Sequence, residues 1–246
     1  LGVSETKKWD SYIEKQSGPT NQKEPSYAHA IGAIYRNADS SDIVVTAAGG
    51  LVGETVQIWK PKKINTFETE WGFSCMGYEI SGALGIKMAK PDQDVIVFIG
   101  DGSYLLANSD IYSSVIYDQK LIIIVCDNGG HMVINRLQLA KGGKEYICNL
   151  RAARATNLQF VDFAAHAKSM GAESEAVSST SELEAAFLRA KKSKKTYVIS
   201  IKTHGYEWLD GTAFWDSPTL EIHSTEENKK AHKEHIEGKK RQRKGI

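Results

Sequence analysis

Two apolar runs, each followed at once by a glycine-containing polar turn, constrain the fold of this chain most strongly. Residues 94–99 are nearly all apolar and lead into Gly-Asp-Gly-Ser at 100–103, and residues 120–126 lead into Asp-Asn-Gly-Gly at 127–130. Runs that are apolar along their whole length are typical of parallel strands, which helices cover on both faces. The chain between the two turns is long enough for a crossover helix, expected over 104–117.

Hard oxygen ligands stand at the ends of both predicted strands. Asp101 and Asn128 fall at the carboxyl edge of the sheet, where open α/β sheets bind ligands. Gly100 and Gly102 let a phosphate approach the backbone, and Ser103 falls where the following helix should begin. Mg²⁺ takes one or two such side chains and completes its shell with phosphate oxygens. The pattern predicts a magnesium-diphosphate site.

Other interpretations of these motifs fit the sequence less well. Taken singly, each motif could be only a turn, but their joint position at two strand ends favours a ligand site. A nicotinamide dinucleotide fits less well, because the third glycine of its fingerprint would stand where the chain has Leu105. A phosphate-binding loop of the Gly-Lys-Ser/Thr type is absent from the sequence.

Composition indicates an ordinary soluble globular protein. The 246 residues carry a net charge of +1, and 41% of them are hydrophobic, which argues against a general nucleic-acid surface. We find no apolar run of transmembrane length and no signal-peptide core, so we expect neither a membrane nor a nucleic-acid partner. The cysteines Cys75, Cys126 and Cys148 form no Cys-x-x-Cys pair and suit a reducing cytoplasm.

The alternation of strand and helix patterns predicts an α/β fold with a doubly wound, mostly parallel sheet and helices on both faces. We expect a linker or arm over 1–25, one domain over 26–210, and an extension over 211–246 that ends in a basic helical tail. The expected strands cover 42–47, 65–69, 94–99, 120–126 and 196–202. The expected helices start near Ser26, before Trp59, after Gly72, at 104, at 160, and at a Ser181-x-x-Glu184 capping box. A loop of about thirty residues follows Asn128, a length that is usually functional.

With these motifs, the chain resembles the C-terminal diphosphate-binding domain of thiamine diphosphate-dependent enzymes. In that family Gly-Asp-Gly is followed by Asn at this spacing. The resemblance implies thiamine diphosphate and Mg²⁺ as cofactors, with the metal on the side chains of Asp101 and Asn128 and on the carbonyl of Gly130. The diphosphate would be surrounded by Gly102, Ser103, Gly130, His131 and Met132.

The resemblance extends upstream, to the segment that holds the thiamine pyrimidine ring. Residues 72–78, Gly-Phe-Ser-Cys-Met-Gly-Tyr, match it. Met76 would lie under the cofactor and keep it bent, a task that suits a long polarizable side chain. The backbone of the Ser74-Cys75-Met76 stretch would bind the aminopyrimidine. The alternative for Met76 is a core methionine on an amphipathic helix. The loop expected at the distal phosphate comprises Gly49, Gly50 and Leu51.

Several stretches resemble one branch of the family, the trihydroxycyclohexanedione hydrolases of myo-inositol catabolism. The most specific is Glu-Trp-Gly-Phe-Ser-Cys-Met-Gly-Tyr-Glu-Ile at 70–80, with further matches at 46–49, 134–138 and 203–207. This likeness implies a hydrolase that breaks a C–C bond and opens a polyhydroxylated cyclic dione. Polar candidates for the substrate cleft are His131, Asn135, Arg136 and His204.

The family needs a glutamate that activates the cofactor, and it lies on a separate pyrimidine-binding domain. This chain has room for one such domain only, so the catalytic residue is unassigned here. We expect the missing domain from an N-terminal part or a partner chain, in a homo-oligomer of at least two copies. The chain alone should then be inactive. Two alternatives stay open: a part of an acetolactate-synthase-like carboligase, and a non-catalytic binding or assembly module.

Overall fold

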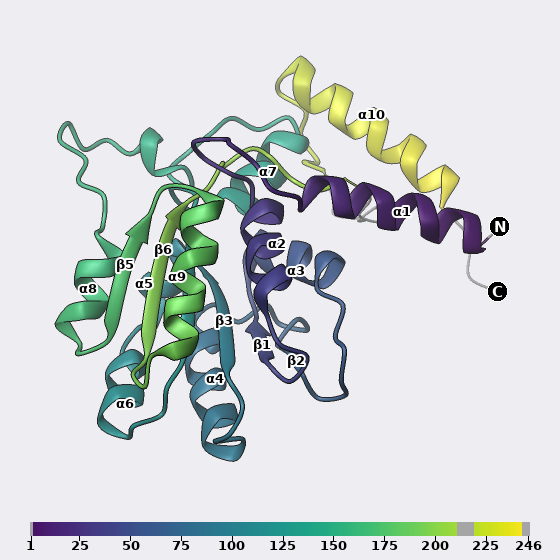
Figure 1. Ribbon diagram of the computed structural model, residues 1–246. Helices are drawn as coiled ribbons and strands as arrows, with labels where there is room; N and C mark the ends of the chain where they lie inside the picture. Colours follow the sequence, from purple (N-terminus) through teal and green to yellow (C-terminus); the bar gives the residue numbers. More distant parts are fainter. Residues whose placement is uncertain (1, 211–218, 243–246) are drawn as a thin grey trace. The chain divides into compact units, whose positions relative to one another are not determined.

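The computed structural model describes residues 2–210 and 219–242. Its sheet is parallel throughout, with the strand order β2-β1-β3-β4-β6-β5 among the described residues (Figure 1). The strands are β1 (Ile43–Thr46), β2 (Phe67–Thr69), β3 (Val95–Gly100), β4 (Ile122–Asp127), β5 (Glu173–Val177) and β6 (Tyr197–Lys202). The predicted α/β class and parallel sheet are confirmed.

Helices cover both faces of this sheet (Figure 1). On one side, α3 (Gly49–Ile58) and α9 (Thr180–Lys192) pack on the strands and on α2 (Tyr27–Asn37). On the other side, α4 (Tyr78–Ala89), α5 (Asp101–Leu106) and α8 (Phe163–Ser169) pack on the strands, and α6 (Asp110–Ile116) packs on α4. Alternate residues of β3 serve the two faces: Val95, Val97 and Ile99 join the core under α4, α5 and α8. Both faces of the central strands are therefore buried.

The chain changes direction across the sheet between β1 and β3. The connection from β1 through α3 leads outward to β2, whereas the connection from β2 through α4 returns past β1 to β3. At such a switch point the two following helices lie on opposite faces and leave a crevice at the carboxyl ends of the strands. The ligand site of a doubly wound sheet is expected there.

Among the described residues, 2–128 and 159–208 form one compact unit, and 129–158, 209–210 and 219–242 form a second. The second unit holds α7 (Met132–Ala140), a short 3₁₀ helix (Leu150–Ala152) and α10 (Glu226–Arg241). The side-chain amide of Asn228 donates to the carbonyls of Lys141 (3.2 Å) and Gly142 (2.8 Å), which fixes the start of α10 on the turn after α7. The segment 129–158, which the sequence placed in the domain 26–210, thus clusters with the C-terminal extension.

Several elements differ from the expectations. The segment 1–25, expected as a linker or arm, contains the helix α1 (Gly2–Gln16), in which Ile13 is buried. The loop after Asn128 contains α7. The edge strand β5 was not foreseen, because its Glu173 and Glu175 dilute the apolar signal of a strand.

Two helix boundaries also differ. The single helix expected over 104–117 is two helices, and the first begins at Asp101 rather than at Ser103. The serine that caps α9 is Ser179, not Ser181: its hydroxyl accepts from the N–H of Glu182. A second Ser-x-x-Glu two residues earlier therefore provides the cap.

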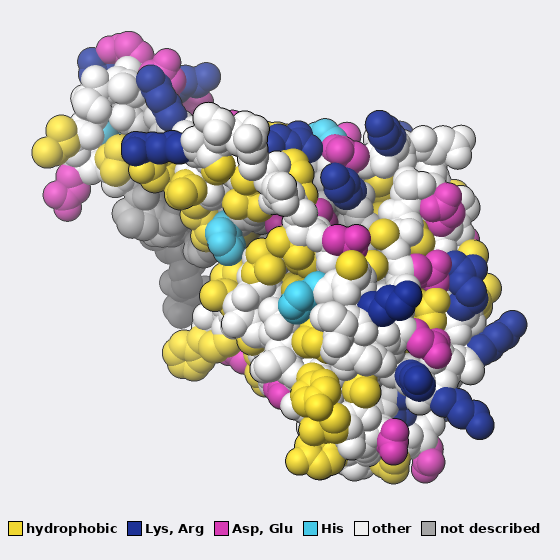
Figure 2. Space-filling view, turned by 90° about the vertical axis from the view of Figure 1, so that its left-hand side faces the viewer, with side chains coloured by type: hydrophobic (Ala, Val, Ile, Leu, Met, Phe, Trp, Pro, Cys, Tyr) yellow, Lys and Arg dark blue, Asp and Glu magenta, His cyan; other side chains and the backbone are white. Residues whose placement is uncertain are grey.

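None of the described helices is long and apolar enough to cross a membrane. On the face drawn in Figure 2, lysine and arginine side chains are interspersed with aspartate and glutamate side chains, and apolar side chains lie between them.

A charge cluster around the buried Asp42 lies at the opposite, amino-terminal edge of the sheet. Lys191 of α9 contacts Asp42 (2.6 Å) and Asp39 (2.8 Å), which precede β1. Burial raises the pKa of Asp42, and its hydrogen bond from Lys191 opposes that shift. The end of α9 is thereby attached to the start of β1.

We predict that Lys191→Ala lowers the free energy of unfolding by about 3 kcal/mol, because it leaves Asp42 buried without its cation. Urea unfolding measures this. The control is Lys192→Ala, an exposed neighbour in the same helical turn, for which we expect a change within about 0.5 kcal/mol. Equal effects of the two substitutions would contradict a stabilising ion pair between Lys191 and the buried Asp42.

Candidate functional site

Three helices that start at the carboxyl edge of the sheet, α3, α4 and α5, have no cap from the side chain of their N-cap residue. The residues before α3, α4 and α5 are Ala48, Gly77 and Gly100, and none makes a side-chain capping bond. By contrast, α2, α8 and α9 are capped by Ser26, Asp162 and Ser179. Uncapped first turns present backbone N–H groups and a positive dipole end, which suit an anion such as a diphosphate.

Asp101 and Asn128 stand at the ends of neighbouring strands. Gly100 pairs with Cys126 across β3 and β4, so the two chains leave the sheet side by side. Asp101 is 2% exposed. The amide nitrogen of Asn128 donates to the hydroxyl of Tyr27 (2.6 Å), so the amide oxygen is the atom that a hard cation would use.

Three carboxylates act on the thiol and the phenol at these strand ends. Burial raises the pKa of the Cys126 thiol, and the carboxylates of Asp101, Glu54 and Asp127 raise it further. The same three carboxylates, after burial, raise the pKa of Tyr27. A divalent cation would be attracted to this place.

Among the described residues, no group of three or more His, Cys, Asp or Glu could hold a metal. A cation at Asp101 and Asn128 would therefore take the rest of its shell from a bound phosphate, as Mg²⁺ commonly does.

The predicted phosphate loop lies in the first turn of α3. Gly49 and Gly50 begin the helix, and the side chain of Leu51 is buried in the core, so these residues offer backbone N–H groups to a ligand. Gly50 is required for packing: a Cβ there would lie 2.4 Å from the ring of Trp208. Trp208 in turn meets Tyr27 edge to face, with ring centroids 5.9 Å apart.

The segment predicted to hold the pyrimidine ring is a turn organised by Glu70. One carboxylate oxygen accepts from the N–H of Phe73 (3.0 Å) and the other from the N–H of Cys75 (2.7 Å). These bonds lower the pKa of Glu70. Ser74 has φ +51°, in the left-handed region. Glu70 thus restrains the backbone of this turn at two points.

Met76 lies in this turn and not on a helix, since α4 begins at Tyr78. Its side chain is 38% exposed. The interpretation of Met76 as a core methionine on an amphipathic helix is therefore wrong, because the helix begins only after Gly77.

Glu79 was not foreseen as part of the site. It is 1% exposed, and its two oxygens accept from the N–H groups of Ala48 (3.2 Å) and Gly77 (2.8 Å). Burial raises the pKa of Glu79, and the side chain of Ser103 opposes that shift. The sequence feature that could have revealed it is the position of Glu79 next to Ile80, on the side of the helix that is buried.

Gly130, His131 and Met132 belong to the second unit and begin α7 there. Gly130 has φ +138°, and a Cβ would lie 2.3 Å from the carbonyl oxygen of Cys148. The N–H of His131 donates to the same carbonyl (2.8 Å), and no side-chain bond caps α7. The first turn of α7 is thus another uncapped helix start.

The other polar candidates have structural contacts. Asn135 is buried and donates to Glu145 (2.9 Å). The backbone N–H of His204 donates to the carbonyl of Pro25 (2.9 Å), and its ring accepts from the N–H of Tyr206 (3.2 Å). Arg136 is exposed on α7.

Two buried hydroxyls at the same edge are suited to a ligand. Thr46 ends β1 and Thr203 follows β6, and within the described part of the chain neither Oγ1 has a hydrogen-bond partner. The N–H of Thr203 donates to the carbonyl of Asp127 (2.8 Å), which places it beside the metal candidate Asn128. A buried hydroxyl without a partner is costly, and a polar ligand at this edge could supply an acceptor.

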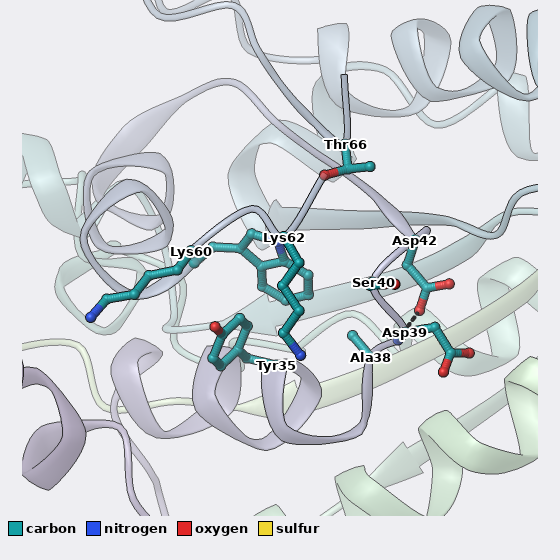
Figure 3. A pocket seen from close by; sticks show the side chains of 9 residues that line it. Tyr35, Ala38, Asp39, Ser40, Asp42, Lys60, Lys62 and Thr66 are labelled. Atoms are coloured by element: carbon teal, nitrogen blue, oxygen red, sulfur yellow. Dashed lines mark hydrogen bonds between the residues drawn. The ribbon is translucent and has the colours of Figure 1, made fainter. Parts of the chain in front are cut away.

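Neither of two cavities in the first unit is lined by the predicted cofactor residues. A hollow of about 10 Å³ lies among Tyr35, Asp39, Asp42, Lys60 and Lys62, at the amino-terminal edge of the sheet (Figure 3). A groove of about 330 Å³ runs past the ends of β4, β5 and β6, between Asp127, Val177 and Lys202.

Comparisons with known proteins bear on this site. A family model described as "Thiamine pyrophosphate enzyme, C-terminal TPP binding domain" matches residues 47–201, a range that includes every first-unit candidate named for the cofactor. Thiamine pyrophosphate is another name for thiamine diphosphate.

Curated relatives carry the name 3D-(3,5/4)-trihydroxycyclohexane-1,2-dione hydrolase. The protein of Halalkalibacterium halodurans is 36% identical over 86% of this chain and 33% of its own length. The protein of Lacticaseibacillus casei is 35% identical over 91% of this chain and 34% of its own length. The chain spans about a third of the length of these relatives.

A solved structure shares the fold. It is the thiamine diphosphate-dependent 4-hydroxybenzoylformate decarboxylase of Rhodococcus jostii RHA1, with a TM-score of 0.63 and 19% identity, over 75% of this chain and 34% of that one.

Glu79 and Glu70 should make contributions to the free energy of unfolding that change with pH in opposite directions. The pKa of Glu79 is raised above 4.5 by burial, so the folded state binds the proton more tightly and loses stability as pH rises from 4.5 through the folded pKa. We predict that the stability of the wild type relative to Glu79→Gln falls over that window in urea unfolding.

Glu70→Gln provides the control of opposite sign. The pKa of Glu70 is lowered, so its contribution should be present above 4.5 and lost as pH falls through the folded pKa. Parallel pH profiles for the two variants would refute these assignments.

Proposed function

The chain belongs to the thiamine diphosphate-dependent enzymes and contains their C-terminal cofactor-binding domain, and from this premise we propose that it binds thiamine diphosphate through Mg²⁺. Asp101, Asn128 and the carbonyl of Gly130 would hold the metal. The backbone at Gly102, Ser103, His131 and Met132 would surround the diphosphate, with the first turn of α3 at its distal phosphate.

One observation carries this proposal: uncapped helix starts stand at the switch point of the sheet, next to a buried aspartate. Ala48 and Gly100 precede α3 and α5 without a side-chain cap, and β1 and β3, which lead into them, are hydrogen-bonded neighbours. Open N–H groups suit the phosphates, and the negative field of Asp101 suits the cation that phosphates bring with them.

The bound cofactor would supply an electron sink for the carbanion that forms when a C–C bond next to a carbonyl breaks. The residues of this chain would position it. Met76, partly exposed in its turn, would pack under the cofactor, and the backbone of Ser74, Cys75 and Met76 would bind the aminopyrimidine.

We propose further that a pyrimidine-binding domain completes the site and supplies the activating glutamate. The chain spans about a third of its relatives' length. Large apolar side chains are exposed around the pyrimidine turn: Trp71 is 50% and Phe73 is 89% exposed. Such side chains suit burial under another domain, from the same polypeptide or from a partner copy in a dimer or larger oligomer.

For the complete enzyme we propose hydrolysis of a C–C bond in a cyclic 1,2-dione that carries hydroxyl groups, in the cytoplasm. The names of the relatives support trihydroxycyclohexane-1,2-dione as the substrate. The free cysteines Cys75, Cys126 and Cys148 suit a reducing compartment.

We expect calorimetric titration of the chain to detect thiamine diphosphate binding that requires Mg²⁺. Asp101→Asn keeps the shape and removes the charge, so binding should weaken at least about tenfold, or ~1.4 kcal/mol. Asp118→Asn is the control, because asparagine tolerates the φ of +52° at that position. If Asp101→Asn still binds the cofactor in a magnesium-dependent way with unchanged affinity, Asp101 is not a ligand of the metal.

Turnover tests the substrate. With its pyrimidine-binding domain added, the chain should open the cyclic dione and leave pyruvate unchanged, whereas the chain alone should do neither. Release of the open-chain acid can be followed by chromatography. Condensation of pyruvate would indicate a carboligase, and cofactor binding without any turnover in the complete assembly would indicate a non-catalytic module.

A further inference from the structure

We propose that Glu79 is a positioning residue that holds three cofactor-binding segments in one arrangement. These are the N-cap residue of α3, which precedes the predicted phosphate loop, the pyrimidine turn before α4, and the first turn of α5. The inference rests on the proposed function, and it assigns a task to a side chain outside the predicted set of cofactor and metal contacts.

Two of these segments donate a hydrogen bond to the same buried carboxylate, and the third interacts with it through Ser103. The N–H of Ala48 donates to Oε1 (3.2 Å) and the N–H of Gly77 to Oε2 (2.8 Å). The side chain of Ser103, in the first turn of α5, favours the ionised form of the same carboxylate and lowers its pKa. Because Glu79 is 1% exposed, water does not replace these bonds when they break.

A helix-capping role alone does not explain this arrangement. One oxygen does cap α4, since Gly77 is its N-cap residue and a negative charge suits the first turn. The other oxygen reaches Ala48, which is 31 residues away in the chain. A cap needs no such distant partner, and Ala48 precedes the helix turn expected at the distal phosphate.

Close packing gives the three segments little freedom around Glu79. A Cβ on Gly77, which has φ +96°, would lie 2.6 Å from the Cβ of Ala107, the residue that ends α5. The pyrimidine turn therefore rests directly on the helix that begins with Asp101. A shift of the turn would move the backbone groups for the pyrimidine relative to those for the diphosphate.

Because cofactor affinity depends on simultaneous contact with all three segments, the loss of their common acceptor should weaken binding more than it weakens the fold. Glu79→Gln keeps the size of the side chain, but its NH₂ group donates and cannot accept both N–H groups.

The test measures Mg²⁺-dependent thiamine diphosphate affinity by calorimetry, and amide hydrogen exchange without cofactor, on the full chain. Glu79→Gln should bind about tenfold more weakly and exchange faster in both 46–50 and 74–78. Glu79→Asp keeps the charge at a shorter reach and should fall between wild type and Glu79→Gln; it replaces the latter if that variant does not fold.

The matched control is Asp42→Asn. Asp42 is also a buried carboxylate that accepts a backbone N–H, from Asp39 (2.9 Å), and it lies at the opposite edge of the sheet (Figure 3). We expect this variant to unfold more easily while its cofactor affinity and the exchange of 46–50 stay as in the wild type.

The outcomes separate this inference from the proposed function. Absence of binding by the wild type, with or without the added pyrimidine-binding domain, would overturn the proposed function, and the exchange data would still test Glu79. Faster exchange in 74–78 alone would reduce Glu79 to a helix cap and overturn the inference. Equal loss of affinity in Glu79→Gln and Asp42→Asn would do the same.

Discussion

Parallel pairing of β1, β3 and β4 is the interaction on which the rest of this structure depends. The hydrogen-bonded register brings Val45 level with Val97 and Gly100 level with Cys126, so three connections leave the sheet at one edge. The apolar side chains of these strands are buried on both faces, which prevents the strands from sliding without exposing the core. The candidate residues of the first unit lie in the segments that follow the strands at this edge.

The central strands and their turns could be predicted because their signals are local. A run such as 94–99, followed by glycines, requires burial on both faces and a sharp exit wherever it occurs. The edge strand β5 and the helix α1 could not be predicted in this way. The strand β5 carries two glutamates and is held by its pairing with β6, which the local sequence does not indicate. The helix α1 is polar and mostly exposed, with Ile13 buried.

The residues of the site also differ in whether a local sequence signal predicts their position. Asp101 and Asn128 follow their strands directly, so their neighbourhood could be inferred from spacing and strand order. Glu79 could not, since its partners Ala48 and Ser103 lie far away in the chain and meet it only through packing. The turn at Met76 was missed for a related reason: Glu70 holds two N–H groups there and delays the start of α4.

The contact between Gly50 and Trp208 has a consequence for how this sequence can change. No side chain larger than hydrogen fits at position 50 while the indole occupies its place, 2.4 Å from where a Cβ would stand. The indole also meets Tyr27, the hydroxyl partner of Asn128. A larger residue at position 50 therefore requires a smaller one at position 208, which lies 158 residues further along the chain. Loss of the tryptophan would also remove a ring contact of Tyr27, whose hydroxyl accepts from the metal candidate Asn128.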